Sequence, residues 1–361
     1  MKVKGVKIED KERYMLIDSY GEPIKPVIKY LKYLDFTGKA ENTLKAYCYH
    51  LKLYFEFLEE VNTSYKEVHI DLLATFIGWL RQPSQSLKVT ELKPTKAKRS
   101  DRTVNIVLNC VIGFYDYLMR SEEYENTINE QTKNQLSARF RRFKPFLHHI
   151  SNGKQINRNI LKVKEPKRLV QTLRKDQIEC LYTACNNIRD QLLIRVLYEG
   201  GLRISEAMSL WIEDFNIGES CITVRKSKTI EGEKRKVFVS SETMNLFQEY
   251  LLDYHMQNID TNFVFIKLTG KNSGEPLDDQ AVRSLVRRVR KKTGVPFTPH
   301  KLRHTFATEL HEHGTDIAVI QKLLGHAHVQ TTIQTYLHLS DETIKESYEQ
   351  ARSNMVIRRG N

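Results

Sequence analysis

From Pro299 to Tyr336 the chain reads PHKLRHTFATELHEHGTDIAVIQKLLGHAHVQTTIQTY. We expect this stretch to form three helices, over 299–314, 316–324 and 328–338, followed by a final segment from Asp341. His300 and Arg303 are three residues apart, so both project from the same face of the first helix. This spacing places an imidazole beside a guanidinium.

Six polar residues in the second half of the chain form a set suited to holding one phosphate. In chain order they are Arg203, Lys228, His300, Arg303, His326 and Tyr336. Two Arg forks match phosphate oxygens bidentately, which Lys cannot do, and would neutralise the extra charge of a pentacoordinate transition state. A phenol, with a pKa of about 10, becomes a usable nucleophile where cations stabilise its anion. The set indicates phosphodiester chemistry without a metal or other cofactor.

Each of these residues also has an ordinary structural explanation. Arg203 follows Gly200 and Gly201, where positive φ costs little, and a helix-start Arg can simply pair with Glu206. A single His-x-x-Arg is more often a surface pair. Most of the 17 tyrosines should be core or rim aromatics, but Tyr336 lies in a polar helix with few apolar neighbours. The inference therefore depends on the ordered set.

The histidines of this region present a competing zinc site. His300 and His304 have i, i+4 spacing, but a zinc hydrolase helix carries Glu directly after the first His, where this chain has Lys301. Acids do not gather around the later histidines to complete a site. We expect no metal, and chelator sensitivity would distinguish a zinc hydrolase.

Positive charge is concentrated in the middle of the chain. The net charge is +13, and between Lys133 and Lys175 there are thirteen Lys and Arg against one acid, Glu165. A second basic cluster runs from Lys93 to Arg102. Such density is expected where phosphates are neutralised, although a solvated basic linker is the alternative. The charge favours a nucleic acid partner.

Composition predicts a cytoplasmic protein. Hydrophobic residues make up 40% of the chain, and no run approaches the ~20 apolar residues of a membrane helix. The charged N-terminus is followed by neither an apolar stretch nor a cleavage site, so no secretory signal is evident. The five cysteines are scattered without a Cys-x-x-Cys pair, which indicates reduced core thiols.

The basic stretch also marks a domain boundary, because prolines and a Ser-Asn-Gly run interrupt helical periodicity there. The length of 361 residues allows two domains of ordinary size. We expect an N-terminal arm at 1–20, a helical domain at 21–145, a basic linker at 146–170 and a catalytic domain with a C-terminal tail at 171–361.

The expected elements give a mainly α fold class. In the first domain the apolar spacing predicts helices over about 26–34, 42–58, 70–80 and 100–118, with a cap near Asn42. In the second domain it predicts helices over 175–186, 189–198 and 278–292, and a hairpin of strands 221–224 and 236–239 that a third run, 263–266, could join. The catalytic domain is therefore mostly α with one small antiparallel sheet.

The ordered set of residues resembles the tyrosine recombinases, the phage integrase family, and most resembles the transposase A type integrases of transposons. The hairpin between the two Arg elements has its usual place in that family. A helix opening Asn42-Thr-Leu-x-x-Tyr47 is typical of the family's helical core-binding (SAM-like) domain, which faces DNA. The resemblance covers most of the chain and implies the tyrosine recombinase fold.

The resemblance also implies a role for each site residue. Arg203 and Arg303 would clamp the non-bridging oxygens of the scissile phosphate, and His326 would donate a further hydrogen bond. Lys228 would protonate the departing 5′ oxygen, and His300 would assist proton removal from the attacking tyrosine. Other hairpin lysines (Lys226, Lys234 and Lys236) compete with Lys228 for the acid role.

Tyr336 would attack the phosphate and leave a 3′-phosphotyrosyl enzyme with a free 5′ hydroxyl. Rejoining needs no ATP, because the covalent link stores the phosphodiester energy. Members of the family act as tetramers on two paired sites in double-stranded DNA, in some cases with partner recombinases of the same element. The tail from Asp341 to Asn361 resembles the segment that docks on a neighbouring subunit.

Two other functions use similar residues. A type IB topoisomerase-like enzyme shares the chemistry but relaxes supercoils without a defined site. A non-catalytic DNA-binding regulator would keep the basic stretch and lose catalysis, and the six filled positions disfavour it. We therefore expect a site-specific recombinase or integrase that serves transposition or integration of a mobile element.

Overall fold

The computed structural model of the chain describes a defined set of residues: 1–8, 11–82, 99–121, 161–166, 171–255, 261–327, Glu349 and Arg352. These divide into two compact units, 1–167 and 168–361. Each unit has its own hydrophobic core. The expected helix at 328–338, the segment from Asp341 and the nucleophile Tyr336 lie outside the described residues.

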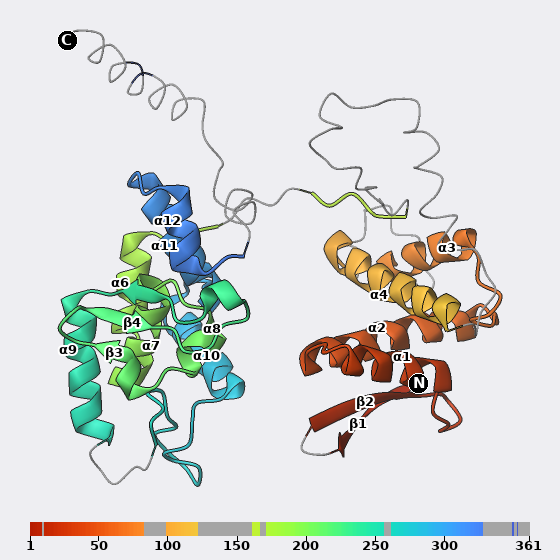
Figure 1. The fold of residues 1–361 in the computed structure, drawn as a ribbon, viewed down its shortest axis with the longest axis horizontal. Coiled ribbons are helices and arrows are strands. Elements are labelled where there is room, and N and C mark those ends of the chain that lie inside the picture. The colour runs from red at the N-terminus through yellow and green to blue at the C-terminus, as the bar shows by residue number, and fades with distance from the viewer. Residues whose placement is uncertain are drawn as a thin grey trace. The chain divides into compact units, whose positions relative to one another are not determined.

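The described residues of the first unit form a β-hairpin and four helices (Figure 1). Its elements are β1 (Lys2–Ile8), β2 (Lys11–Ile17), α1 (Lys25–Phe36), α2 (Glu41–Glu60), α3 (Ile70–Arg81) and α4 (Asp101–Arg120). The strands pair antiparallel, with Lys2 opposite Ile17. Residues 1–20, expected as an arm, thus contain a hairpin whose Leu16 is fully buried in the core of this unit.

The helices of the first unit follow the apolar periodicity of the sequence. In α4 the buried side chains Val104, Leu108, Val111 and Tyr115 recur at three- and four-residue spacing, as predicted. Ser100 caps this helix, because its side chain accepts a hydrogen bond from the Thr103 N–H. The predicted cap near Asn42 is wrong: α2 begins at Glu41 after Ala40, with no side-chain cap.

The segment 161–166 returns to the first unit. Leu161 and Val163 pack against its core, and Asn105 of α4 bonds the backbone of Val163 in both directions at 2.9 Å. The Asn105 amide also donates to Glu165 at 2.7 Å. Of the expected linker 146–170, the described residues 161–166 therefore contact the first unit, and 171 onward belongs to the second.

The second unit is mostly helical around a small sheet. Its elements are α6 (Lys175–Thr183), α7 (Ile188–Glu199), α8 (Ile204–Met208), β3 (Phe215–Asn216), β4 (Cys221–Thr223), β5 (Lys236–Phe238), α9 (Ser241–Tyr250), α10 (Asp279–Thr293), α11 (Pro299–Glu312) and α12 (Ile317–Leu324). Two 3-10 turns, Ile212–Asp214 and Ile230–Gly232, and a π-helical turn, Leu251–His255, connect them. The mainly α prediction is confirmed.

The sheet differs from the expected one in its third member. Its order is β3-β4-β5, all antiparallel, with Phe215 opposite Ile222 and Ile222 opposite Val237. The run 263–266 makes only isolated bridges, such as that between Trp211 and Phe263. Helix α9 was not among the expected elements, although Ser240 caps it and Met244 and Phe247 are buried on one face.

Most of the cysteines are at least partly buried. Cys48, Cys110 and Cys221 are buried and unpaired, whereas Cys180 is exposed, so that cysteine is not a core thiol. Among the described helices, none has the length and apolar character that crossing a membrane requires.

Candidate active site

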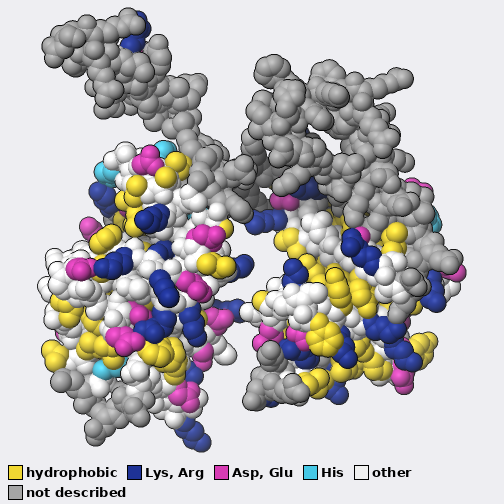
Figure 2. Space-filling model, viewed as in Figure 1, with side chains coloured by type: hydrophobic (Ala, Val, Ile, Leu, Met, Phe, Trp, Pro, Cys, Tyr) yellow, Lys and Arg dark blue, Asp and Glu magenta, His cyan; other side chains and the backbone are white. Residues whose placement is uncertain are grey.

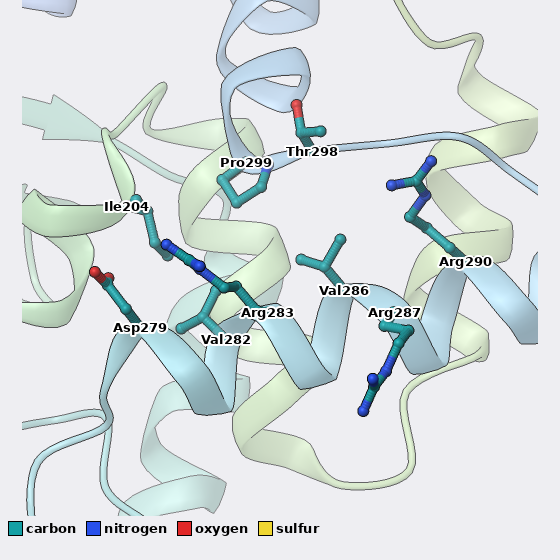
Figure 3. Close-up of a pocket in the computed structure, with 9 residues that line it drawn as sticks. All are labelled: Ile204, Asp279, Val282, Arg283, Val286, Arg287, Arg290, Thr298 and Pro299. Atoms are coloured by element: carbon teal, nitrogen blue, oxygen red, sulfur yellow. The ribbon is translucent and has the colours of Figure 1, made fainter. Parts of the chain in front are cut away.

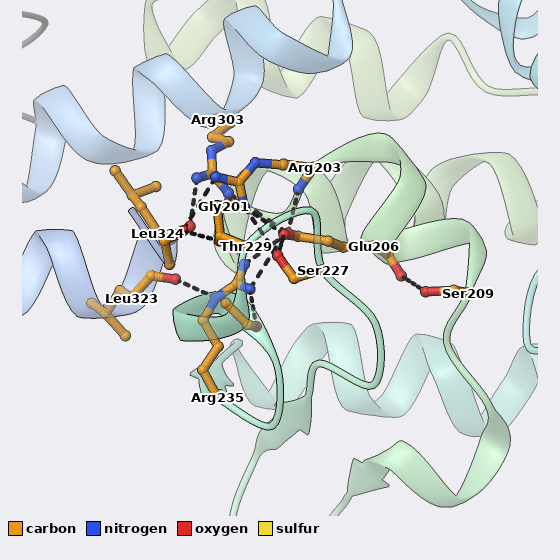
Figure 4. Close-up of polar contacts among 12 residues, drawn as sticks. Gly201, Arg203, Glu206, Ser209, Ser227, Thr229, Arg235, Arg303, Leu323 and Leu324 are labelled. Carbon is orange, nitrogen blue, oxygen red and sulfur yellow. Dashed lines mark hydrogen bonds and ion pairs between the residues drawn. The ribbon is translucent and has the colours of Figure 1, made fainter. Parts of the chain in front are cut away.

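Three arginines converge on one buried glutamate in the second unit (Figure 4). Glu206 of α8 is fully buried, and its carboxylate accepts from Arg203 Nη1 at 2.6 Å and from Arg235 Nη2 at 2.7 Å. Arg303 Nη1 lies 3.7 Å from the same carboxylate. Arg203 precedes α8, Arg235 precedes β5 and Arg303 belongs to α11, so the cluster joins three separate parts of the chain.

The cluster keeps Glu206 ionised. Burial alone would raise the pKa of Glu206, but hydrogen bonds from Arg235 and Ser227 and the Arg235 charge outweigh it and hold the pKa at about 2. One carboxylate facing three guanidiniums leaves an excess of positive charge. An anion approaching this cluster therefore meets a preorganised, partly desolvated cation site.

The two predicted arginines lie at different depths. The Arg203 side chain is 22% exposed and bonds Ser227 Oγ and the Gly325 carbonyl, both at 3.2 Å. The Arg303 side chain is 2% exposed, and it donates to the Gly201 carbonyl at 2.7 Å and to the Leu324 carbonyl at 2.5 Å. Arg303 thus fixes the turn after α7 against the end of α12, and Arg203 reaches the surface.

Gly201 has the backbone conformation expected for the Gly-Gly turn. Its φ is +58°, and a Cβ there would lie 2.4 Å from a ring carbon of Phe306. Gly200 ends α7 with an ordinary negative φ. Only the second glycine therefore requires the left-handed region.

The loop between β4 and β5, which carries Lys228, contacts this cluster. Ser227 donates to Glu206 at 2.7 Å, and Thr229 donates to the Gly325 carbonyl at 2.9 Å, so both neighbours of Lys228 contact site residues. Lys228 itself is exposed. Of the competing lysines, Lys236 pairs with Glu219 at 2.7 Å. This arrangement favours Lys228 as the lysine of the site.

The histidines lie beside the arginines. His300 and His304, one turn apart on α11, have their Nε2 atoms 2.8 Å apart. His326 follows Gly325, the C-cap of α12. Arg303, Arg203 and His304 are among the residues whose charges act on its ring. Five of the six predicted residues (Arg203, Lys228, His300, Arg303 and His326) therefore belong to the elements that meet at this cluster, and Tyr336 is outside the described residues.

Two histidines are held neutral. Burial, followed by the charges of His300 and Arg303, lowers the pKa of His304 to about 4. Burial, followed by the charges of Arg303 and Arg203, lowers the pKa of His326 to about 4. At neutral pH each ring therefore carries one N–H donor and one acceptor nitrogen.

These depressed pKa values predict acid-sensitive stability. Unfolded His binds a proton below about pH 6.5, whereas His304 and His326 stay neutral in the folded protein down to about pH 4, so stability falls as the pH falls through this window. We expect the midpoint of urea denaturation to drop between pH 7 and 5, and His304→Asn with His326→Asn to reduce the drop. The exposed His313→Asn is the control, and an equal reduction there would contradict the assignment.

Sequence reasoning missed Arg235 and treated Glu206 only as a partner of Arg203. A signal for Arg235 existed: residues 235, 237 and 239 alternate with exposed neighbours, and Arg235, Val237 and Val239 are all buried. An arginine on the inward face of a strand needs a buried acid. Ser227 and Thr229 were also missed.

The described residues contain no group of three or more His, Cys, Asp and Glu side chains arranged to hold a metal ion. The His300–His304 pair therefore has no third such ligand among them. The donor set of the site consists mainly of arginines, which do not ligate metals and instead suit an anion.

A basic groove of about 530 Å³ is lined in part by Ile204, which follows Arg203 in the chain (Figure 3). Its floor includes Val282 and Val286 of α10. Its charged lining residues are Arg283, Arg287 and Arg290, with one acid, Asp279. Thr298 and Pro299, at the start of the helix that carries Arg303, close one side. The groove therefore brings further cations to the same unit as the arginine cluster.

Two family models match this chain. The phage integrase family model covers residues 171–343, and the model of the phage integrase N-terminal SAM-like domain covers 27–122. The second range contains α2, α3, α4 and most of α1, and the first contains all the site residues named above.

Individual relatives give the same result. The chain is 43% identical to transposase A from transposon Tn554 of Staphylococcus aureus over 96% of this chain and 97% of that protein. It is 29% identical to tyrosine recombinase XerA of Pyrococcus horikoshii over 90% and 92% of the two chains. By fold it is similar to the Tn1549 transposon integrase in complex with transposon right end DNA, with a TM-score of 0.60, 18% identity and coverage of 90% and 98%.

Proposed function

Because the chain belongs to the phage integrase family of tyrosine recombinases, we propose that it is a site-specific DNA recombinase that serves transposition of a mobile element. Its substrate is double-stranded DNA, which it cleaves and rejoins through a 3′-phosphotyrosyl intermediate. The observation that carries this proposal is the convergence of Arg203, Arg235 and Arg303 beside His326. The likeness to a transposase over nearly the whole chain supports the transposition role.

The depth of the two predicted arginines suggests how the phosphate is held. Arg203, the more exposed, contacts a non-bridging oxygen directly, and Arg303 stabilises the same charge from beneath. Neutral His326 donates an N–H to a phosphate oxygen. These donors act in a partly desolvated site, where stabilisation of a developing charge is large.

Proton transfers fall to the remaining residues. Tyr336 attacks phosphorus and loses its proton, with His300 accepting it, while Lys228 gives a proton to the departing 5′ oxygen. The 3′ phosphate remains bonded to the tyrosine oxygen. A 5′ hydroxyl of a second strand then attacks the phosphorus, and the tyrosine oxygen leaves and regains its proton. One phosphodiester bond replaces another, so no external energy source is needed. Two such exchanges on each of two sites fit a tetramer of this chain or of this chain with partner recombinases.

A trapping experiment tests the proposal. Nicked suicide duplexes from a random-sequence pool are incubated with the protein in EDTA, and SDS-stable protein–DNA adducts are isolated and sequenced. We expect an adduct on the 3′ phosphate, which Tyr336→Phe abolishes, because the phenylalanine lacks the nucleophilic oxygen. Tyr348→Phe, at the next tyrosine in the sequence, is the matched control and should form the adduct.

Other outcomes identify the rival functions. An adduct that persists in Tyr336→Phe moves the nucleophile elsewhere. Loss of activity in EDTA points to a metal hydrolase, and relaxation of any supercoiled plasmid without a preferred site points to a topoisomerase. DNA binding without an adduct indicates a non-catalytic regulator.

The basic groove supports DNA as the partner. Arg283, Arg287 and Arg290 are exposed on α10, whereas Arg288 on the same helix pairs with Asp190 at 2.9 Å. Figure 2 shows Lys and Arg side chains gathered, with acids among them, on the face of the second unit that is in view. A cationic groove in the same unit as the arginine cluster suits the backbone phosphates that flank a scissile phosphate.

Neutralising the groove should weaken DNA binding in a salt-dependent way. We expect Arg283→Gln with Arg287→Gln to lower affinity for the trapped site, and to reduce the slope of log affinity against log salt by about one to two, because each phosphate contact adds about 0.9. Titrations between 50 and 200 mM salt, roughly the range in which such slopes are measured, provide the test. Lys271→Gln, on the exposed turn between Gly270 and Gly274, should leave the slope unchanged.

A further inference from the structure

Arg235 lies at the centre of the cluster, although the proposed chemistry gives it no role. Its side chain is 4% exposed. All three of its nitrogens donate: Nε to the Leu323 carbonyl at 2.8 Å, Nη1 to the Gly232 carbonyl at 2.6 Å, and Nη2 to Glu206 at 2.7 Å (Figure 4). An ammonium group cannot reproduce this planar fork in three directions.

Each acceptor belongs to a different part of the site. Leu323 is in the last turn of α12, three residues before His326. Gly232 is in the loop that carries Lys228. Glu206 also accepts from the backbone N–H of Arg203 at 2.8 Å and from its guanidinium. One side chain thus connects the groups proposed to hold the phosphate and to protonate the leaving oxygen.

The loop and α12 are also pressed together beside Arg235. A Cβ built on Gly325 would lie 2.6 Å from Gly232 Cα and 3.1 Å from Arg235 Nη1. The backbones meet this closely only where both residues lack side chains. The guanidinium therefore ties two segments that are in direct contact. Removing it takes away the donor to the Leu323 and Gly232 carbonyls and one of the donors to the buried Glu206 carboxylate.

We propose that Arg235 is a positioning residue for strand cleavage, which orients Arg203 through Glu206 and fixes the Lys228 loop against the end of α12 next to His326. The proposal rests on the proposed function of the site. It assigns Arg235 no contact with DNA, so its loss should slow the chemical step and leave DNA affinity nearly unchanged.

The test compares Arg235→Met and Arg235→Lys with Arg189→Met. Arg189 is a matched control, because it is also a buried arginine of the second unit that bridges an acid, Asp190, and a backbone carbonyl, that of Ile266. The duplex that carries the site identified by trapping is used at saturating concentration. We expect Arg235→Met to form the covalent adduct at least ~10-fold more slowly than the unsubstituted protein, and Arg235→Lys to be intermediate. The rate of Arg189→Met should stay within ~3-fold of the unsubstituted protein. DNA dissociation constants should change less than ~3-fold in all three.

A pH series separates positioning from a general loss of stability. The charged groups facing Glu206 are Arg203, Arg235 and Arg303, with the neutral His326 beside them. Without Arg235, Glu206 loses its largest counter-charge and becomes protonated at higher pH. The rate of Arg235→Met relative to the unsubstituted protein should therefore fall as the pH is lowered from 8 to 5. The rates are compared only at pH values where circular dichroism shows both proteins folded, and there a purely structural defect gives a constant ratio.

The outcomes distinguish this proposal from the proposed function. If the unsubstituted protein forms no adduct, both are overturned. If it does, and Arg235→Met cleaves within 3-fold of it, loses affinity instead of rate, or gives a pH-independent ratio, the positioning role alone is overturned. Should Arg235→Met not fold by circular dichroism, Arg235→Lys takes its place in the same comparison.

Discussion

Arg303→Lys should slow strand cleavage by an amount on the order of 10²-fold, because it displaces a preorganised charge beneath the phosphate. Arg303 donates from separate nitrogens to the Gly201 and Leu324 carbonyls and lies 3.7 Å from Glu206. A lysine ammonium cannot hold both carbonyls in this geometry, so the charge moves relative to the phosphate. The rate of adduct formation at saturating DNA measures the effect.

Loss of this arginine also destabilises the second unit, so the measurement needs a folding control. Each carbonyl left without a donor costs about 1–3 kcal/mol. Arg189→Lys removes a comparable buried fork away from the cluster, and it should lower the melting temperature while leaving the cleavage rate near that of the unsubstituted protein. An unchanged rate in Arg303→Lys, assayed where it is folded, would remove Arg303 from the active site.

Gly325→Ala should damage both stability and cleavage. Gly325 ends α12 with φ +61°, a conformation that costs a residue with a Cβ about 1–2 kcal/mol. The new Cβ would also meet Gly232 Cα at 2.6 Å, a backbone atom that can yield only if the Lys228 loop moves. We expect a cleavage rate at least ~10-fold lower, which corresponds to about 1.4 kcal/mol in the barrier.

Gly294→Ala separates the two components of that effect. Gly294 ends α10 with φ +71°, and nothing lies within 4 Å of a Cβ built there. This variant therefore has the backbone cost without the clash, and should lower the melting temperature and leave cleavage unchanged. Equal cleavage rates in the two variants would show that the contact between Gly325 and the loop has no role in the reaction.

The sequence predicted the parts of this fold that depend on local periodicity. In α4 and α10 apolar residues recur every three or four positions, and the buried faces follow them. Spacing along a helix also placed His300 and Arg303 on one face of the same helix, whereas the other site residues were named from the ordered set. Five of the six residues are described, and they lie on the elements that meet around Glu206.

Features that depend on tertiary contacts were not predictable in this way. Strand β3 has only two residues and exists because it pairs with β4, so it has no periodic signal of its own. The hairpin of β1 and β2 has mixed charges along its length, and its burial comes from packing on α2. Arg235 combines both situations. The alternation of residues 235–239 along a strand places its side chain inward, but its acid partner, Glu206, is 29 residues away in the sequence and only the fold brings them together.

Because residues 161–166 pack on the first unit, only a short segment connects that unit to the second. From Pro166 to Gln171 the chain advances five residues, which reach about 18 Å when fully extended. If the first unit binds DNA, as its resemblance to the family's core-binding domain implies, the second unit meets the scissile phosphate at an effective concentration on the order of millimolar. Even a weak intrinsic affinity of the second unit for DNA would then suffice for it to occupy the cleavage site. Lengthening the 167–170 segment should therefore lower the cleavage rate further with each residue inserted.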